Sequence, residues 1–198
     1  MEDPTEAVDA AEAALKIAPQ KVGRIVAVAV AMANAAHGHA LRRDRTTCER
    51  SYTTAQDLVG QLEADPSSPW ALFLDHSYVE VQRARSLTLL GEYGAAVESF
   101  QKAISCLPRG YRRDRGVYLA REAVAHIGNG DVEQASTVGL QALAIGAETG
   151  SARIIGELKC LDTALGRFST TSSAADFRDA MHETDTQWSL PAVEREED

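Results

Sequence analysis

The chain has few of the residues that cross-link small proteins or anchor them in membranes. Among 198 residues are three cysteines, Cys48, Cys106 and Cys160, and aromatic residues make up 6%. The cysteines are not spaced as in a zinc site, so we expect free, buried thiols, no disulfide and no metal. No run of about 18 apolar residues occurs, so no transmembrane helix is predicted. The acidic N-terminus is unlike a signal peptide, and we expect a cytoplasmic chain with no membrane contact.

Positive charge is also scarce, and the formal net charge is −9. Nucleic-acid affinity comes largely from basic side chains that displace counterions from phosphates. The charge balance therefore argues against direct contact with DNA or RNA. Two local arginine clusters, at 41–45 and 109–115, are interpreted as solvated loops between helices.

Signatures of catalysis and nucleotide binding are absent from the sequence. There is no GxSxG, no GxxxxGK[ST] and no strand-linked GxGxxG. His37 and His39 point about 200° apart on a helix, so they cannot easily share one ion. The carboxylate pairs are interpreted as solvated helix faces. We predict no enzyme and no cofactor; an unrecognised enzyme remains an alternative, since sequence cannot reveal a cleft that shifts carboxylate pKa values.

What the chain does contain is a repeated arrangement of small residues. A small residue is followed, usually, by a large one four positions later and by another small one three after that. These spacings place each trio on one face of a helix. Two trios match weakly, because their middle residue is itself small. The four trios are Ala7-Ala11-Ala14, Cys48-Tyr52-Ala55, Ala96-Phe100-Ala103 and Ala135-Gly139-Ala142.

The segment from Gly91 to Pro108 contains the clearest trio. Gly91 and Tyr93 suit a turn, and Pro108 cannot continue a helix. The segment resembles the turn and second helix of a tetratricopeptide repeat, a helix–turn–helix unit of ~34 residues. The intervals between the trios all exceed that length, so we expect a divergent array.

The resemblance predicts an all-α fold, a right-handed superhelical solenoid of antiparallel helix pairs with about eight or nine helices. A single repeat domain is expected over residues 1–186, followed by an acidic, disordered tail over 187–198. A turn is expected at 128–131. Besides the helices that contain the trios, helices are expected at 20–42, 69–90, 114–128, 151–166 and 172–184.

Three segments, Pro69-Trp70, 107–120 and Ser151-Ala152-Arg153, narrow the resemblance. They look like the C-terminal repeat region of actinobacterial transcriptional regulators that have an N-terminal helix-turn-helix domain of the XRE type. The resemblance covers roughly residues 4–166 and implies the sensor or interaction part of such a regulator. We interpret the chain as beginning inside a repeat, either as a truncated or separately encoded sensor half or because its true start lies upstream. We therefore do not expect DNA binding by these residues.

The resemblance also implies a binding groove, because in this repeat class the first helix of each pair lines the concave side. We expect it to hold a peptide or protein segment. Arg85 and Arg121 could bind a carboxylate, and Asn34 resembles one element of a two-asparagine, two-lysine clamp whose lysines are absent. The alternative is an ordinary solvated wall. The candidate groove residues are Asn34, His37, Tyr78, Gln82, Arg85 and Arg121.

A homo-oligomerisation module is the second functional hypothesis. A chain that starts in the middle of a repeat leaves the apolar face of residues 7–18 uncovered. Such a face would favour pairing with a second copy, that is, a homodimer.

Overall fold

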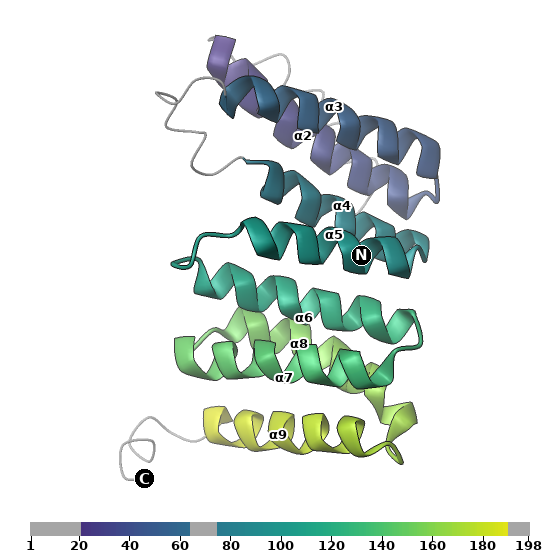
Figure 1. The fold of residues 1–198 in the computed structure, drawn as a ribbon, viewed down its shortest axis with the longest axis vertical. Helices are drawn as coiled ribbons and strands as arrows, with labels where there is room; N and C mark the ends of the chain where they lie inside the picture. Colours follow the sequence, from purple (N-terminus) through teal and green to yellow (C-terminus); the bar gives the residue numbers. More distant parts are fainter. Residues whose placement is uncertain (1–20, 64–74, 190–198) are drawn as a thin grey trace. The chain divides into compact units, whose positions relative to one another are not determined.

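The computed structural model describes residues 21–63 and 75–189, and within them it contains eight α-helices and no strand. The all-α prediction is therefore confirmed (Figure 1). The helix expected around residues 6–19 and the Pro69-Trp70 dipeptide lie outside the described residues. The elements are α2 (Lys21–Leu41), α3 (Arg45–Glu63), α4 (His76–Leu90), α5 (Tyr93–Cys106), α6 (Arg112–Gly128), α7 (Val132–Thr149), α8 (Ala152–Leu165), the 3₁₀ turn η1 (Gly166–Phe168) and α9 (Ser172–Ser189).

The chain divides into two compact units, Met1–Leu107 and Pro108–Asp198. In the first unit, α2 pairs with α3 and α4 pairs with α5, and α4 also packs on α2 and α3. The core is built largely from alanines of α2 together with Tyr52 and Val59 of α3. Small side chains let these helices approach closely, as the composition of the trios predicts. The two trios of this unit that lie in the described residues are buried, with Tyr52 and Phe100 each 1% exposed, and the trio Ala7-Ala11-Ala14 lies outside the described residues.

The turn between α4 and α5 forms where the sequence predicts it. Gly91 has φ 83°, in the left-handed region that favours glycine, and its N–H donates to the last carbonyls of α4. The start of α4 differs from the prediction of one helix over 69–90. Asp75 is extended, and its carboxylate accepts from the backbone N–H of Tyr78 at 2.8 Å. This N-cap begins the helix at His76, because a capping aspartate needs non-helical backbone angles.

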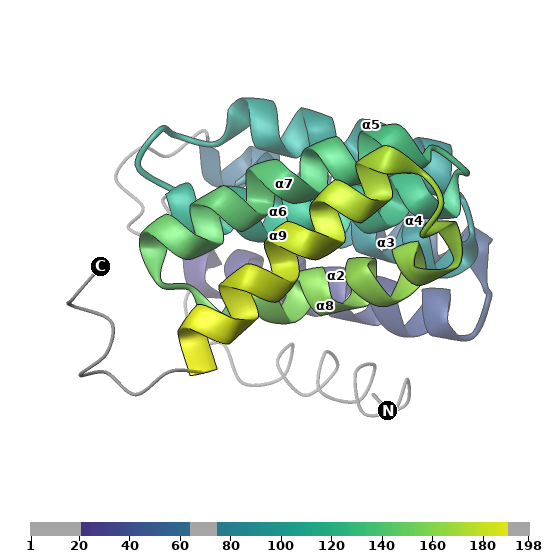
Figure 2. The same ribbon diagram turned by 90° about the horizontal axis from the view of Figure 1, so that it is seen from below.

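In the second unit, α6 pairs with α7, α8 packs on both of them, and α9 packs mainly on α7. Figure 2 shows α9 running obliquely across α7. The four helices enclose a core of leucines and isoleucines from α8 with Phe177 of α9. Helix α9 continues to Ser189, three residues past the predicted end of the domain. Residues 190–198 of the predicted tail lie outside the described part of the chain.

The trio of α7 shows why its middle residue is a glycine. Ala135 and Ala142 are fully buried, as the spacing predicts. A Cβ on Gly139 would lie 2.5 Å from Leu161 Cδ2 and 2.8 Å from Phe177 Cε2. The place that Tyr52 and Phe100 fill in the other trios is therefore occupied from outside the helix, by side chains of α8 and α9.

Candidate functional site: the α2–α4 face

Five of the six predicted groove residues lie on two helices that pack together in the first unit. Tyr78, Gln82 and Arg85 are spaced four and three residues apart, so they share one face of α4. Asn34 and His37 share a face of α2, on which Asn34 is exposed and His37 is half-buried. We call these five residues the α2–α4 face.

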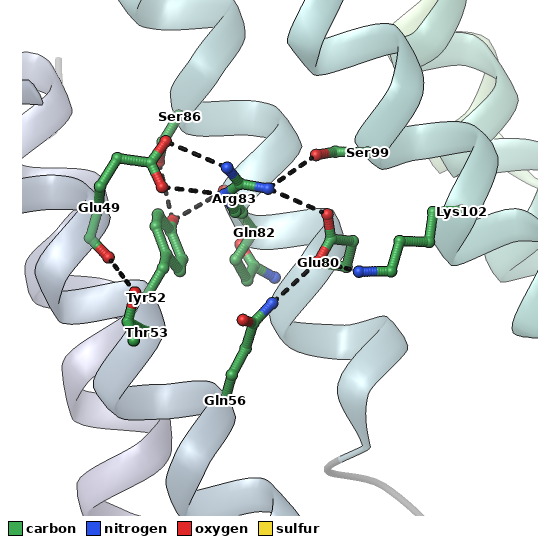
Figure 3. Close-up of polar contacts among 10 residues, drawn as sticks. All are labelled: Glu49, Tyr52, Thr53, Gln56, Glu80, Gln82, Arg83, Ser86, Ser99 and Lys102. Atoms are coloured by element: carbon green, nitrogen blue, oxygen red, sulfur yellow. Dashed lines mark hydrogen bonds and ion pairs between the residues drawn. The ribbon is translucent and has the colours of Figure 1, made fainter.

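A series of hydrogen bonds beneath this face links α2 to α4 and α4 to α3. The Tyr52 hydroxyl donates to the Gln82 carbonyl at 2.7 Å, and its oxygen lies 2.8 Å from Ser86 Oγ. Ser86 Oγ in turn lies 3.1 Å from His37 Nδ1. Tyr52 and Ser86 are almost fully buried, and burial raises the pKa of the Tyr52 hydroxyl. The hydroxyl therefore keeps its proton. The hydrogen bond to Ser86 holds His37 in place relative to α4. Figure 3 shows the Tyr52, Gln82 and Ser86 members of the series.

Arg85 is held on the face by its neighbour one helical turn earlier. Its NH1 group donates to Gln82 Oε1 at 2.9 Å. Burial raises the pKa of Tyr78, while the nearby Arg85 charge opposes that shift. A guanidinium and a phenol ring therefore lie in the same neighbourhood. A positioned guanidinium of this kind suits a carboxylate, whose two oxygens match the planar fork of N–H donors.

Arg121, the sixth predicted residue, belongs to α6 in the second unit. Its guanidinium pairs with Glu157 of α8, with Nε 3.0 Å from Glu157 Oε1 and NH2 against the same oxygen. The Arg121 side chain is 15% exposed. A ligand carboxylate there would have to displace an internal one, so a ligand-binding role for Arg121 stays a prediction. The partner was not foreseen, because Glu157 lies 36 residues away along the chain.

A second polar cluster, which the sequence reasoning missed, lies between α3, α4 and α5 (Figure 3). Glu80 is 3% exposed. Its carboxylate accepts from Gln56 Nε2 at 2.9 Å, Lys102 Nζ at 3.3 Å and Arg83 NH1 at 3.4 Å. Arg83 also donates through Nε to Glu49 Oε2 at 3.0 Å. The sequence signal was the spacing of three between Glu80 and Arg83 in α4, which lets the two side chains pair on one face.

This cluster joins three helices, and its charged and polar groups find their hydrogen-bond partners within the unit. Its members are Glu49, Gln56, Glu80, Arg83 and Lys102. Buried carboxylates that lose their partners are costly. We therefore assign it to holding α4 between α3 and α5.

The cysteines and the arginines of 109–115 differ in part from what the sequence predicts. The three thiols are free, but only Cys48 is buried, and burial raises its pKa to about 11. Cys106 and Cys160 are exposed, on helix surfaces that face away from the cores. Arg112 pairs with Glu148, and Arg113 donates to the Thr149 carbonyl, so part of the 109–115 cluster fastens the start of α6 to the end of α7.

Neither a metal site nor a membrane-spanning helix is found in the described residues. No group of three or more histidine, cysteine or acidic side chains there could hold a metal ion. None of the described helices is long and apolar enough to cross a membrane. Residues 7–18, on which the homo-oligomer hypothesis depends, lie outside the described ranges.

Comparison with known proteins defines the class of fold. No protein-family model matches the chain, and no curated protein matches it. Among solved structures, the chain is similar to the nearly identical TPR-like repeats of a kinesin light chain-like protein from Podospora anserina. The TM-score is 0.60 at 15% identity, with 95% of this chain and 90% of that chain covered. The chain therefore has a TPR-like helical repeat fold, a fold that generally serves as a scaffold for protein interactions.

Proposed function

We propose that this chain is a non-enzymatic TPR-like scaffold that binds a peptide or protein segment along the α2–α4 face. The observation that supports the proposal is the gathering of five predicted groove residues on two packed helices. Two of them are held by hydrogen bonds, His37 through Ser86 and Arg85 through Gln82. Side chains that are already positioned lose less conformational entropy when a ligand binds.

The chemistry of the face favours a segment that carries a carboxylate, either an acidic side chain or a C-terminus. Arg85 supplies a planar cation for that group. Asn34 offers an exposed amide that can both donate to and accept from a peptide backbone. Tyr78 adds an apolar ring with a polar end, a combination that is frequent at interfaces.

The resemblance of the sequence to actinobacterial XRE-type regulators supports a role as the sensor part of a transcription regulator. In that role, the bound segment would stabilise one arrangement of the repeats over another. A ligand shifts such an equilibrium only as far as its affinities for the two forms differ.

Peptide-library binding to the whole chain tests the proposal. We expect selection of acidic or carboxylate-terminated peptides, with affinity reduced at least about tenfold by Arg85→Glu, which replaces attraction by repulsion. Arg50→Glu is the matched control, because Arg50 is an exposed arginine of α3 outside the face. Arg85→Lys keeps the charge without the fork and should be intermediate. Absence of any selected peptide, or equal binding by the Arg85 and Arg50 variants, would refute the proposal.

A further inference from the structure

A cleft of about 630 Å³ opens between α8 and α9 in the second unit. Helix α9 packs mainly on α7 and touches α8 at fewer positions, so the two last helices leave space between them. Pockets of 300–1,000 Å³ are of the size that holds small molecules or a few residues of a peptide. The lining residues are Lys159, Asp162, Thr163, Ser169, Ala175, Arg178, Asp179, Met181, His182 and Asp185.

The lining is polar except for Ala175 and Met181, and Met181 is buried at 5% exposure. Ala175 and Met181 are the only apolar residues among those that line the cleft, so the specific contacts it offers come from charged and hydrogen-bonding groups. Recognition in this cleft therefore depends on charge and hydrogen bonding.

Two ion pairs join α8 to α9 across the cleft. Arg178 Nε lies 3.0 Å from Asp162 Oδ1, and Lys159 Nζ lies 3.0 Å from Asp185 Oδ1. These pairs use the lysine and the arginine of the lining. Each pair engages one carboxylate oxygen through these contacts, and a carboxylate can accept several hydrogen bonds.

The charges of the lining do not balance. Three aspartates face one lysine and one arginine, with the imidazole of His182 beside them. Asp179 is exposed, and among residues 21–63 and 75–189 its side chain has no ion pair or hydrogen bond. An incoming cation would therefore meet one uncompensated carboxylate, flanked by two that are shared with the crossing pairs. An incoming anion would have to compete with Asp162 and Asp185 for the two cations.

We propose that the α8–α9 cleft binds a lysine or arginine side chain of an extended protein segment, with Asp179 as the main acceptor. The ammonium or guanidinium group lies against Asp179, and the polar walls accept and donate to the backbone of the segment. A segment of a protein suits the cleft for two reasons. The volume of the cleft exceeds that of one side chain, and the polar lining of the cleft continues along both α8 and α9. This site shares no residue with the α2–α4 face, so neither proposal depends on the other.

The test is fluorescence anisotropy of a labelled pentalysine peptide with the whole chain at low and moderate salt. We expect binding that weakens with salt and that falls about fivefold in Asp179→Asn, the loss of one exposed charge pair. Asp176→Asn is the matched control, since Asp176 is an exposed aspartate of α9 outside the lining and its substitution changes the net charge equally. It should change affinity less than twofold.

Three outcomes would overturn the proposal. Equal weakening by the Asp179 and Asp176 variants would show that the peptide responds only to the net charge of −9. Tighter binding of a labelled pentaglutamate peptide would reverse the inferred charge preference. Equal affinity for free spermidine, measured by displacement of pentalysine, would assign the cleft to a small polyamine instead of a protein segment.

Discussion

Replacing Gly139 with alanine places a methyl group in the best-filled part of the second core. In a helix interior alanine is favoured over glycine by about 1 kcal/mol. At this position the new Cβ would lie 2.5 Å from Leu161 Cδ2 and 2.8 Å from Phe177 Cε2, well inside van der Waals contact. Leu161 and Phe177 are both fully buried. Overpacking of a filled core costs about 1–3 kcal/mol, so we expect net destabilisation of about 1 kcal/mol.

The matched variant is Gly156→Ala on α8, where a Cβ would meet nothing within 4 Å. It gains the same propensity without the clash and should stabilise the chain by about 0.5–1 kcal/mol. The difference between the two variants cancels the propensity contribution, so it measures the clash itself, about 1–3 kcal/mol. Urea unfolding followed by circular dichroism at 222 nm gives both values. If Gly139→Ala proves as stable as Gly156→Ala, the close approach of α8 and α9 to α7 is wrong.

Three further perturbations follow from the buried polar groups and the thiols. Tyr52→Phe should destabilise the protein by about 1–2 kcal/mol in urea, because the half-buried Gln82 carbonyl loses its donor from Tyr52; an unchanged midpoint would contradict this hydrogen bond. Glu80→Gln should cost about 1–3 kcal/mol, since a neutral amide replaces the shared acceptor of three donors, and a gain in stability would count against the cluster. At pH 8 a thiol reagent should label two cysteines quickly and Cys48 slowly, because burial raises its pKa to about 11 and keeps it protonated there; rapid labelling of all three would refute its burial.

The fold was predictable because its signals are local. Trios spaced by four and three define a buried face without knowledge of the partner helix, and Gly91 suits its positive φ wherever the turn lies. The start of α4 was not predictable in the same way, because Pro69 and Asp75 are both acceptable start signals. The structure shows that Asp75 caps the helix that follows it.

The candidate site was predictable only in part. Helical spacing places Tyr78, Gln82 and Arg85 on one face, but spacing within a helix cannot reveal which groups arrive from elsewhere. The Glu157 partner of Arg121 and the Leu161 and Phe177 side chains at Gly139 come from other helices. Such contacts depend on tertiary packing, for which a single sequence gives no direct signal.

The hydrogen bonds beneath the α2–α4 face fix which group donates and which accepts, and this order extends to His37 on the face itself. A carbonyl can only accept, so the Tyr52 hydrogen points to Gln82 O and the Ser86 hydrogen points to Tyr52. Ser86 Oγ must then accept from His37, which places the imidazole proton on Nδ1. A neutral His37 is therefore the Nδ1–H tautomer, with Nε2 as its acceptor nitrogen, an assignment that ¹⁵N chemical shifts of the imidazole can check. One backbone carbonyl of α4 thus sets the hydrogen-bonding polarity of a side chain on the neighbouring helix.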